Sequence, residues 1–303
     1  MQEMKATAID DYAKERENLS DYEIDEILNE GKKWNLAETL TRGGSALFPH
    51  TYIKACGYQI AAVVHACLNS GADQVLALGV LHPLTDRLLL SRLREINNQD
   101  LSQHILRGIL GPGTGRDRAW VSEFSLLHFL FLWAEEIKRR GIESPELIIR
   151  YPYLVNKEPE SVPGIDELES IARDSVVVAT SDLCHHGIAY GHTPSEALDI
   201  SEEGEQFAKH QIQQGLDLLI GDDFRRYYDH CRRAKSDSCD VGSILRYILG
   251  PLKGSIVDLH LVDASDLYEG APEPSWVAAT LVELNPFRSA SANELVTNRV
   301  SIQ

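Results

Sequence analysis

Three stretches of the sequence place polar, metal-ligating side chains directly after an apolar run. His50 follows SALFP, and His82 follows LALGVL. A third cluster follows VVVATS and contains Asp182, Cys184, His185 and His186. Imidazole, carboxylate and thiolate groups are the ligands that transition metals take in proteins, and imidazole is also the usual proton carrier near neutral pH. If the three stretches end side by side, they form a polar pocket that could hold a metal ion.

The apolar runs before these residues are typical of buried strands in an α/β fold. Residues 73–82 are apolar almost throughout, as in strands that are covered on both faces. The preceding stretch, 56–71, has helical spacing and stops at Gly71, a natural residue after a helix end. In open α/β sheets, ligands bind beyond the carboxyl ends of the strands. We therefore expect the polar ends of the strands at 45–50, 73–82 and 174–182 to meet there.

The remaining patterns complete this fold class. They predict a helix over 122–141, a strand over 146–155, a mostly helical region over 194–248, and an antiparallel pair over 255–265 and 275–284. The expected architecture is a single α/β domain with a mixed central sheet flanked by helices on both faces.

The chain is expected to form one domain with two flanking segments. Residues 1–40 are polar and helical in pattern, with Ser20 and Glu23 at the spacing of a capping box, and predict an N-terminal helical segment packed on the domain. Residues 41–286 form the α/β domain in this interpretation, and 287–303 form a polar C-terminal tail.

The composition excludes several classes of partner. The 303 residues include 46 acidic and 29 basic side chains, a net charge of −17, which disfavours binding to nucleic acid or to anionic membranes. No apolar run reaches the roughly 18 to 20 residues of a membrane span, and the N-terminus lacks the apolar region of a signal peptide. The 5 cysteines contain no CxxC pair. We expect reduced thiols in a cytoplasmic protein, and a homo-oligomer is compatible with this composition.

Five stretches also resemble, in the same order, the motifs of one known family. They are FPHTYIKACGYQIAAVVHACLNSGADQVLALGVLHPL, SEFSLLH, TSDLCHHGIAYG, DVGSILRYIL and VDLHLVDASDLYEGAPEPSWVAATLVEL. The family is the Memo-like family, which is related to the class III extradiol ring-cleavage dioxygenases. The resemblance runs from about residue 43 to 284. It implies His50 and His82 as two metal ligands and places Asp182 and His185 in the pocket wall. In the related dioxygenases a histidine at the matching place acts as acid and base, which implies that role for His185.

The segment SEFSLLH both matches and departs from the family pattern. Glu123 and His128 match and would lie near the pocket, although Glu123 could instead be an acidic residue that favours a helix N-terminus. Phe124 and Leu127 stand where the family has His and Glu, so the resemblance implies a more apolar pocket.

The third metal ligand stays open between several residues. The family uses a cysteine, and Ser236 occupies that position here. Asp237, Cys239 and Asp240 are the alternatives nearby, unless the loop is simply a solvated acidic turn. Two histidines and one carboxylate are typical of nonheme Fe(II) oxygenases, whereas a thiolate favours copper or zinc. We favour Asp237 or Asp240 with iron and keep Cys239 as an alternative.

These features lead to one main hypothesis and two alternatives. The main one is an enzyme, a mononuclear nonheme metal oxidoreductase of dioxygenase type, that activates O₂ on a small chelating substrate, aromatic molecules included. His185 carries a proton with Asp182 beside it, and Tyr52 and Tyr190 are candidates to contact the substrate. The alternatives are a Memo-like copper-binding or signalling protein without turnover and a zinc-dependent hydrolase.

Overall fold

The fold is built on a mixed sheet of eight strands. The computed structural model describes residues 2–82, 106–115, 118–155, 158–268 and 270–287, with backbone only for 2–9 and 118–119. Strands follow one another in space as β3-β4-β2-β5-β1-β8-β6, and β7 pairs with β8. Their bounds are β1 Ser45–Phe48, β2 Gln74–Leu78, β3 Gly108–Leu110, β4 Glu146–Tyr153, β5 Val176–Thr180, β6 His185–Gly187, β7 Leu252–Asp263 and β8 Ser275–Pro286. Neighbours among β4, β2, β5 and β1 are parallel, and β3, β6, β7 and β8 join antiparallel.

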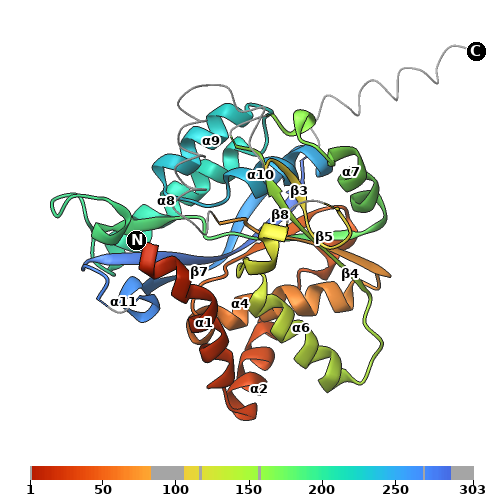
Figure 1. The fold of residues 1–303 in the computed structure, drawn as a ribbon, viewed down its shortest axis with the longest axis horizontal. Coiled ribbons are helices and arrows are strands. Elements are labelled where there is room, and N and C mark those ends of the chain that lie inside the picture. Colours follow the sequence, from red (N-terminus) through yellow and green to blue (C-terminus); the bar gives the residue numbers. More distant parts are fainter. Residues whose placement is uncertain (1, 83–105, 116–117, 156–157, 269, 288–303) are drawn as a thin grey trace, which may run out of the picture.

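Helices cover both faces of this sheet (Figure 1). One face carries α1 Gln2–Glu17, α2 Asp21–Glu30, α3 Ala37–Thr41, α4 Ile53–Asn69 and α6 Leu127–Arg140. The other carries α7 Ile165–Asp174, α8 Glu202–Leu218, α9 Phe224–Arg233 and α10 Cys239–Leu249. Each face has its own buried apolar cluster, because strands covered on both sides bury side chains in both directions. The predicted α/β fold with a mixed, helix-covered sheet is confirmed.

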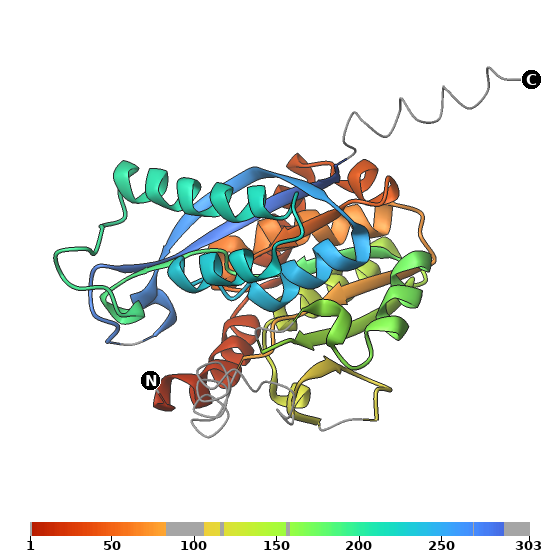
Figure 2. The same ribbon diagram turned by 90° about the horizontal axis from the view of Figure 1, so that it is seen from above.

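The long β7–β8 pair also follows the prediction from sequence. The two strands run antiparallel, and α8 packs alongside β7 (Figure 2). The short helix α11, Ala264–Leu267, stands between them in the chain. This pair extends the sheet beyond β1 and provides the partner for β6.

The N-terminal helices are tied to the rest of the domain by specific contacts. Ser20 and Glu23 form the predicted capping box, in which each side chain accepts from the other residue's backbone N–H. A guanidinium N–H of Arg16 donates to the carbonyl of Leu127 at 3.2 Å. Of the predicted C-terminal tail, 288–303 lie outside the described residues. Within the part that is described, every helix is too short or too polar to cross a membrane.

One local prediction was wrong. The helix expected over 122–141 begins only at Leu127, because residues 118–122 form a 3₁₀ turn and Glu123 folds back to accept the backbone N–H groups of Phe124 and Ser125. Its end is as expected, with Gly141 in the left-handed region at φ 63°. The region 194–248 is mostly helical, as predicted, with helices at Glu202–Leu218, Phe224–Arg233 and Cys239–Leu249.

Candidate metal centre

The strand order explains why the polar strand ends meet. Strands β2, β5 and β1 are parallel neighbours in that order, so their carboxyl ends share one edge of the sheet. His82, Asp182 and His50 follow these strands within a few residues. Asp237 reaches the same edge from the loop between α9 and α10, which lies on the opposite face of the sheet from α4.

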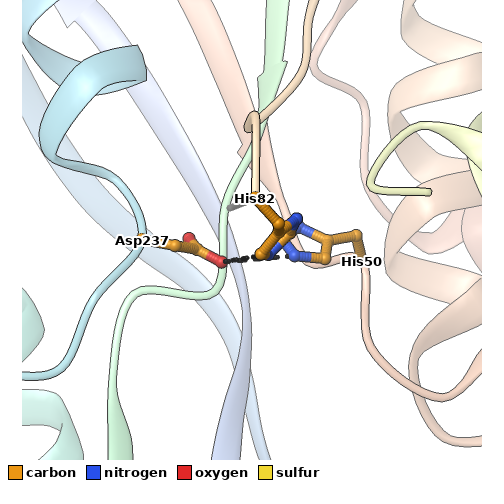
Figure 3. A group of neighbouring side chains, drawn as sticks. All are labelled: His50, His82 and Asp237. Carbon is orange, nitrogen blue, oxygen red and sulfur yellow. Dashed lines mark ion pairs between the residues drawn. The ribbon is translucent and has the colours of Figure 1, made fainter. Parts of the chain in front are cut away.

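His50, His82 and Asp237 form the central triad (Figure 3). Asp237 Oδ2 lies 3.2 Å from His50 Nε2 and 3.8 Å from His82 Nε2. The two imidazole rings stand nearly perpendicular, with centroids 5.3 Å apart. His50 is buried, and the side chains of His82 and Asp237 are only 18% and 16% exposed. Three potential ligand atoms therefore face one point near the end of the sheet.

The orientation of His50 is set by Thr180. The Thr180 hydroxyl donates to the carbonyl of Phe48 at 3.0 Å, which leaves its oxygen lone pairs to accept from His50 Nδ1 at 3.1 Å. In the neutral imidazole the proton then sits on Nδ1, and the lone pair of Nε2 points at Asp237. This is the tautomer that a metal ligand needs.

Glu123 gives His82 the same orientation. Its carboxylate is fully buried and lies 2.8 Å from His82 Nδ1, and it also accepts the backbone N–H of His82. The remaining accepting capacity is used by the N–H groups of Phe124 and Ser125. Glu123 is therefore neither a helix-terminus charge nor a fourth ligand. A carboxylate behind a histidine is the usual outer support of a metal-bound imidazole.

Asp237 is held by one of its two carboxylate oxygens. Oδ1 accepts the Ser181 hydroxyl at 2.7 Å and the backbone N–H of Asp182 at 2.9 Å, while Oδ2 faces the imidazoles. Ser236, another candidate for the third ligand, instead donates its hydroxyl to the carbonyl of Asp182 at 3.3 Å. Ser236 thus shapes the loop that delivers Asp237.

The carboxylates create a strong local preference for positive charge. Burial alone would lower the pKa of His50, but Asp182 and Asp237 outweigh it and raise that pKa. Burial acts in the same sense on His82, yet Glu123 and Asp237 raise its pKa to about 9. Asp237 has a lowered pKa despite burial, because His50 and His82 stabilise its charged form. A cation at this point is favoured, and a bound metal would take the place of the protons on the two Nε2 atoms.

Asp182 and His185 form a second group that shares Asp237. Asp182 Oδ1 accepts the backbone N–H of His50 at 3.2 Å, and its Oδ2 is 3.7 Å from His50 Nε2. Burial, opposed by His50 and aided by Asp237, raises the pKa of Asp182. His185 Nδ1 lies 2.7 Å from the carbonyl of Lys235, so the neutral ring carries its proton there and leaves Nε2 as a base.

A cavity of about 260 Å³ opens onto both groups. Besides the five polar residues above, its lining consists of Tyr12, Thr51, Phe124, Ala189, Tyr190, Leu267, Tyr268 and Val277. Phe124 stacks on the His82 ring at a centroid distance of 4.4 Å. The cavity has a charged floor and a largely aromatic wall. Its volume suits a small molecule lying against the triad.

Cys239 and Asp240 are not brought to the triad. Both lie in the first turn of α10 and line a different, very small cavity with Phe224 and Tyr228. Cys184 is also displaced, since it is buried in the apolar cluster of the α7–α10 face, and burial raises the pKa of its thiol to about 12. The structure therefore brings Asp237, and no cysteine among the described residues, within reach of the two histidines.

Three further candidates have other surroundings. His186 points to the opposite face of β6 from His185, because neighbouring residues of a strand alternate between its faces. There it is buried against Trp276, and its Nε2 accepts the backbone N–H of Leu198. His128 stacks on Tyr12 at 4.5 Å, and its Nε2 lies 3.4 Å from a Glu15 carboxylate oxygen, outside the cavity lining. Tyr52 precedes α4 and packs on the apolar cluster of that face. Tyr190, in contrast, lines the cavity.

Some contributing residues were not predicted. Thr51, Tyr12 and Tyr268 line the cavity, and Thr180 and Ser181 orient the triad. Thr51, Thr180 and Ser181 adjoin predicted residues, so their polarity at a strand end was a usable signal. Tyr12 lies in a polar helix far from these residues in sequence, and its surroundings gave no signal that it would line the cavity.

Comparisons with known proteins add no relative. No protein-family model matches the chain, and no curated protein matches it.

Proposed function

We propose that this protein is a mononuclear metal-dependent oxidoreductase. His50, His82 and Asp237 would bind one divalent metal ion, most simply iron, and the cavity would bind a small chelating, aromatic molecule and O₂. The observation that carries the proposal is the convergence of two imidazole Nε2 atoms and one carboxylate oxygen beside a cavity of about 260 Å³. The resemblance of the strand-end motifs to Memo-like proteins and extradiol dioxygenases points the same way.

The donor atoms fit a first-row transition metal. Two ligand atoms that each lie about 2.1 Å from one ion, at angles of about 90° to 110°, are about 3.0 to 3.4 Å apart. The 3.2 Å between His50 and Asp237 falls in this range, and the 3.8 Å between His82 and Asp237 needs only a small side-chain shift. Two imidazoles and one carboxylate with open positions suit nonheme Fe(II). Bound iron would supply coordination sites and redox chemistry for substrate and O₂.

The protein's own groups would handle substrate protons and exclude water. His185 lines the cavity, and its Nε2 would accept a proton from a substrate hydroxyl, with Asp182 stabilising the imidazolium that results. Phe124 and Tyr12 close the wall next to the histidines and keep bulk water from the reacting groups. Iron is the first metal to test, because two imidazoles and one carboxylate with open positions are the donor set typical of nonheme Fe(II) oxygenases.

The test begins with metal content of protein purified without oxygen, measured by elemental mass spectrometry. Near-stoichiometric iron should be lost in His50→Ala and Asp237→Ala but kept in His210→Ala and Asp229→Ala, whose side chains are exposed. Catechols should then give O₂ uptake that depends on His185. Zinc with ester or amide hydrolysis that ignores O₂ would replace the proposal with a hydrolase. Absence of any metal after reconstitution would refute it.

A further inference from the structure

The N-terminal helix α1 contributes a side chain to the wall of the cavity. Tyr12 lies on this helix, is 6% exposed and lines the cavity that opens onto the triad. Its ring centroid is 5.0 Å from that of Phe124, whose ring in turn stacks on His82 at 4.4 Å. The aromatic wall beside the triad therefore includes a residue of the segment that the sequence pattern placed outside the α/β domain.

Glu15 follows Tyr12 by one helical turn and lies on the same face of α1. Its Oε2 accepts the backbone N–H of Ile53 at 3.1 Å. Ile53 is the first residue of α4 and comes shortly after His50, and α4 has no side-chain cap from its own preceding residue. A helix N-terminus has N–H groups without partners inside the helix and favours negative charge. Glu15 therefore caps α4 from another helix, close to a proposed metal ligand.

His128 joins the same two side chains of α1 to α6. The Tyr12 ring stacks on it at a centroid distance of 4.5 Å, with 12° between the ring planes. Its Nε2 lies 3.4 Å from Glu15 Oε2. One residue further along α1, Arg16 donates to the carbonyl of Leu127 at 3.2 Å. Helix α1 is therefore fixed to the beginnings of both α4 and α6, and Glu15 takes part in both attachments.

We propose that Tyr12 limits the size of the ligand that the metal centre accepts, and that Glu15 is the residue that positions Tyr12. The inference rests on the proposed metal centre and specifies the size of its substrate. A cavity of about 260 Å³ is close to the lower limit for small-molecule sites, about 300 Å³, and suits a molecule with one aromatic ring. Removal of the Tyr12 ring should extend the cavity towards α1, because a large-to-small change leaves a void that its surroundings fill only in part.

The experiment measures how affinity depends on the length of a metal-chelating probe. Protein loaded with Zn²⁺, whose content is determined first, is titrated calorimetrically with benzohydroxamic acid and with 4-phenylbenzohydroxamic acid. Both chelate through the same group, but the second carries another ring in line with the first, and the wild type should prefer the shorter probe. Tyr12→Ala should raise the affinity of the longer probe relative to the shorter one at least about tenfold, the gain from burying one more apolar ring. Tyr12→Phe keeps the ring and should behave as the wild type.

Variants of Glu15 test its positioning role. Glu15→Ala removes the carboxylate that holds α1 and should shift the ratio of the two affinities in the same direction as Tyr12→Ala. Glu15→Gln should keep a ratio near that of the wild type, because its amide oxygen can still accept the N–H of Ile53. Glu17→Ala, at an exposed acid on the same helix, is the matched control. If Glu15→Ala lowers stability in urea titrations but leaves the ratio unchanged, Glu15 is structural only and its positioning role is wrong.

The remaining outcomes separate this inference from the proposed function. A wild-type ratio in Tyr12→Ala would overturn the size limit while leaving the metal centre in place. If neither hydroxamate binds the metal-loaded wild type, the cavity does not admit a ligand to the metal in this way, and the inference is wrong. The proposed function fails on different measurements, which are the absence of bound metal or of O₂ uptake with catechols.

Discussion

His82 Nδ1 lies 2.8 Å from a carboxylate oxygen of Glu123, and that carboxylate also accepts the backbone N–H of His82. One buried acid thus holds both the ring and the main chain of a single histidine. Glu123 precedes α6 on a different part of the chain, 41 residues away. The consequence is a pre-set imidazole whose Nε2 faces Asp237 before any ion binds.

Replacing Glu123 with glutamine should weaken metal binding without removing it. The glutamine oxygen can still accept the backbone N–H of His82, but the negative charge behind the imidazole is gone, so the ring is a weaker base toward the metal. The loss of such a supporting group typically costs about 10- to 100-fold in affinity. Competition against a chelator of known affinity measures the change. Glu143→Gln, an exposed residue, is the matched control. Unchanged affinity in Glu123→Gln would show that the charge of Glu123 does not support metal binding.

The metal-free protein should lose stability as pH rises through the pKa of His82. Its pKa is raised from 6.5 to about 9, so the folded state holds the proton more tightly than the unfolded state does. That contribution is complete below pH 6.5 and is lost as pH approaches 9. We expect the free energy of unfolding, from urea titrations at pH 6 to 9, to fall by on the order of 2 kcal/mol. His82→Gln should flatten this slope, and His210→Ala should not.

Metal binding should be insensitive to the residues that sequence left as alternative ligands. Cys239 and Asp240 lie in a separate cavity, so Cys239→Ala and Asp240→Asn should keep full metal content, whereas Asp237→Asn should lose it. Elemental analysis of the three purified variants decides this, with circular dichroism to establish that each is folded. Metal lost in Cys239→Ala and retained in Asp237→Asn would reverse the assignment.

Each chain should have one tight metal site. The group Asp182, His185 and Asp237 shares a carboxylate with the central triad, and two cations there would repel each other. Titration with Mn²⁺ followed by electron paramagnetic resonance should give one tight equivalent, unchanged in His185→Gln. A second tight equivalent with spin coupling, lost in His185→Gln, would mean that His185 is a ligand rather than a proton carrier.

Much of the framework was predictable from local patterns. Continuous apolar runs predicted the buried strands β2 and β5, period-two alternation predicted the β7–β8 pair, and the Ser20–Glu23 spacing predicted a capping box that forms. The three-residue strands β3 and β6 were missed, because they are too short for a periodic signal and exist through pairing with β4 and β8. The start of α6 was placed too early, because the carboxylate of Glu123 serves His82 rather than a helix end.

The sequence by itself determined which chemistry could gather at the sheet edge. It places His50, His82 and Asp182 after apolar strands, and parallel strands must end at a common edge. Only the tertiary structure decided among Ser236, Asp237, Cys239 and Asp240. Residues so close together all lie within loop reach of the histidines, and their direction depends on the contacts that the loop makes. Asp237 faces the histidines because the Ser181 hydroxyl and the Asp182 N–H hold its other oxygen, while the first turn of α10 carries Cys239 and Asp240 elsewhere.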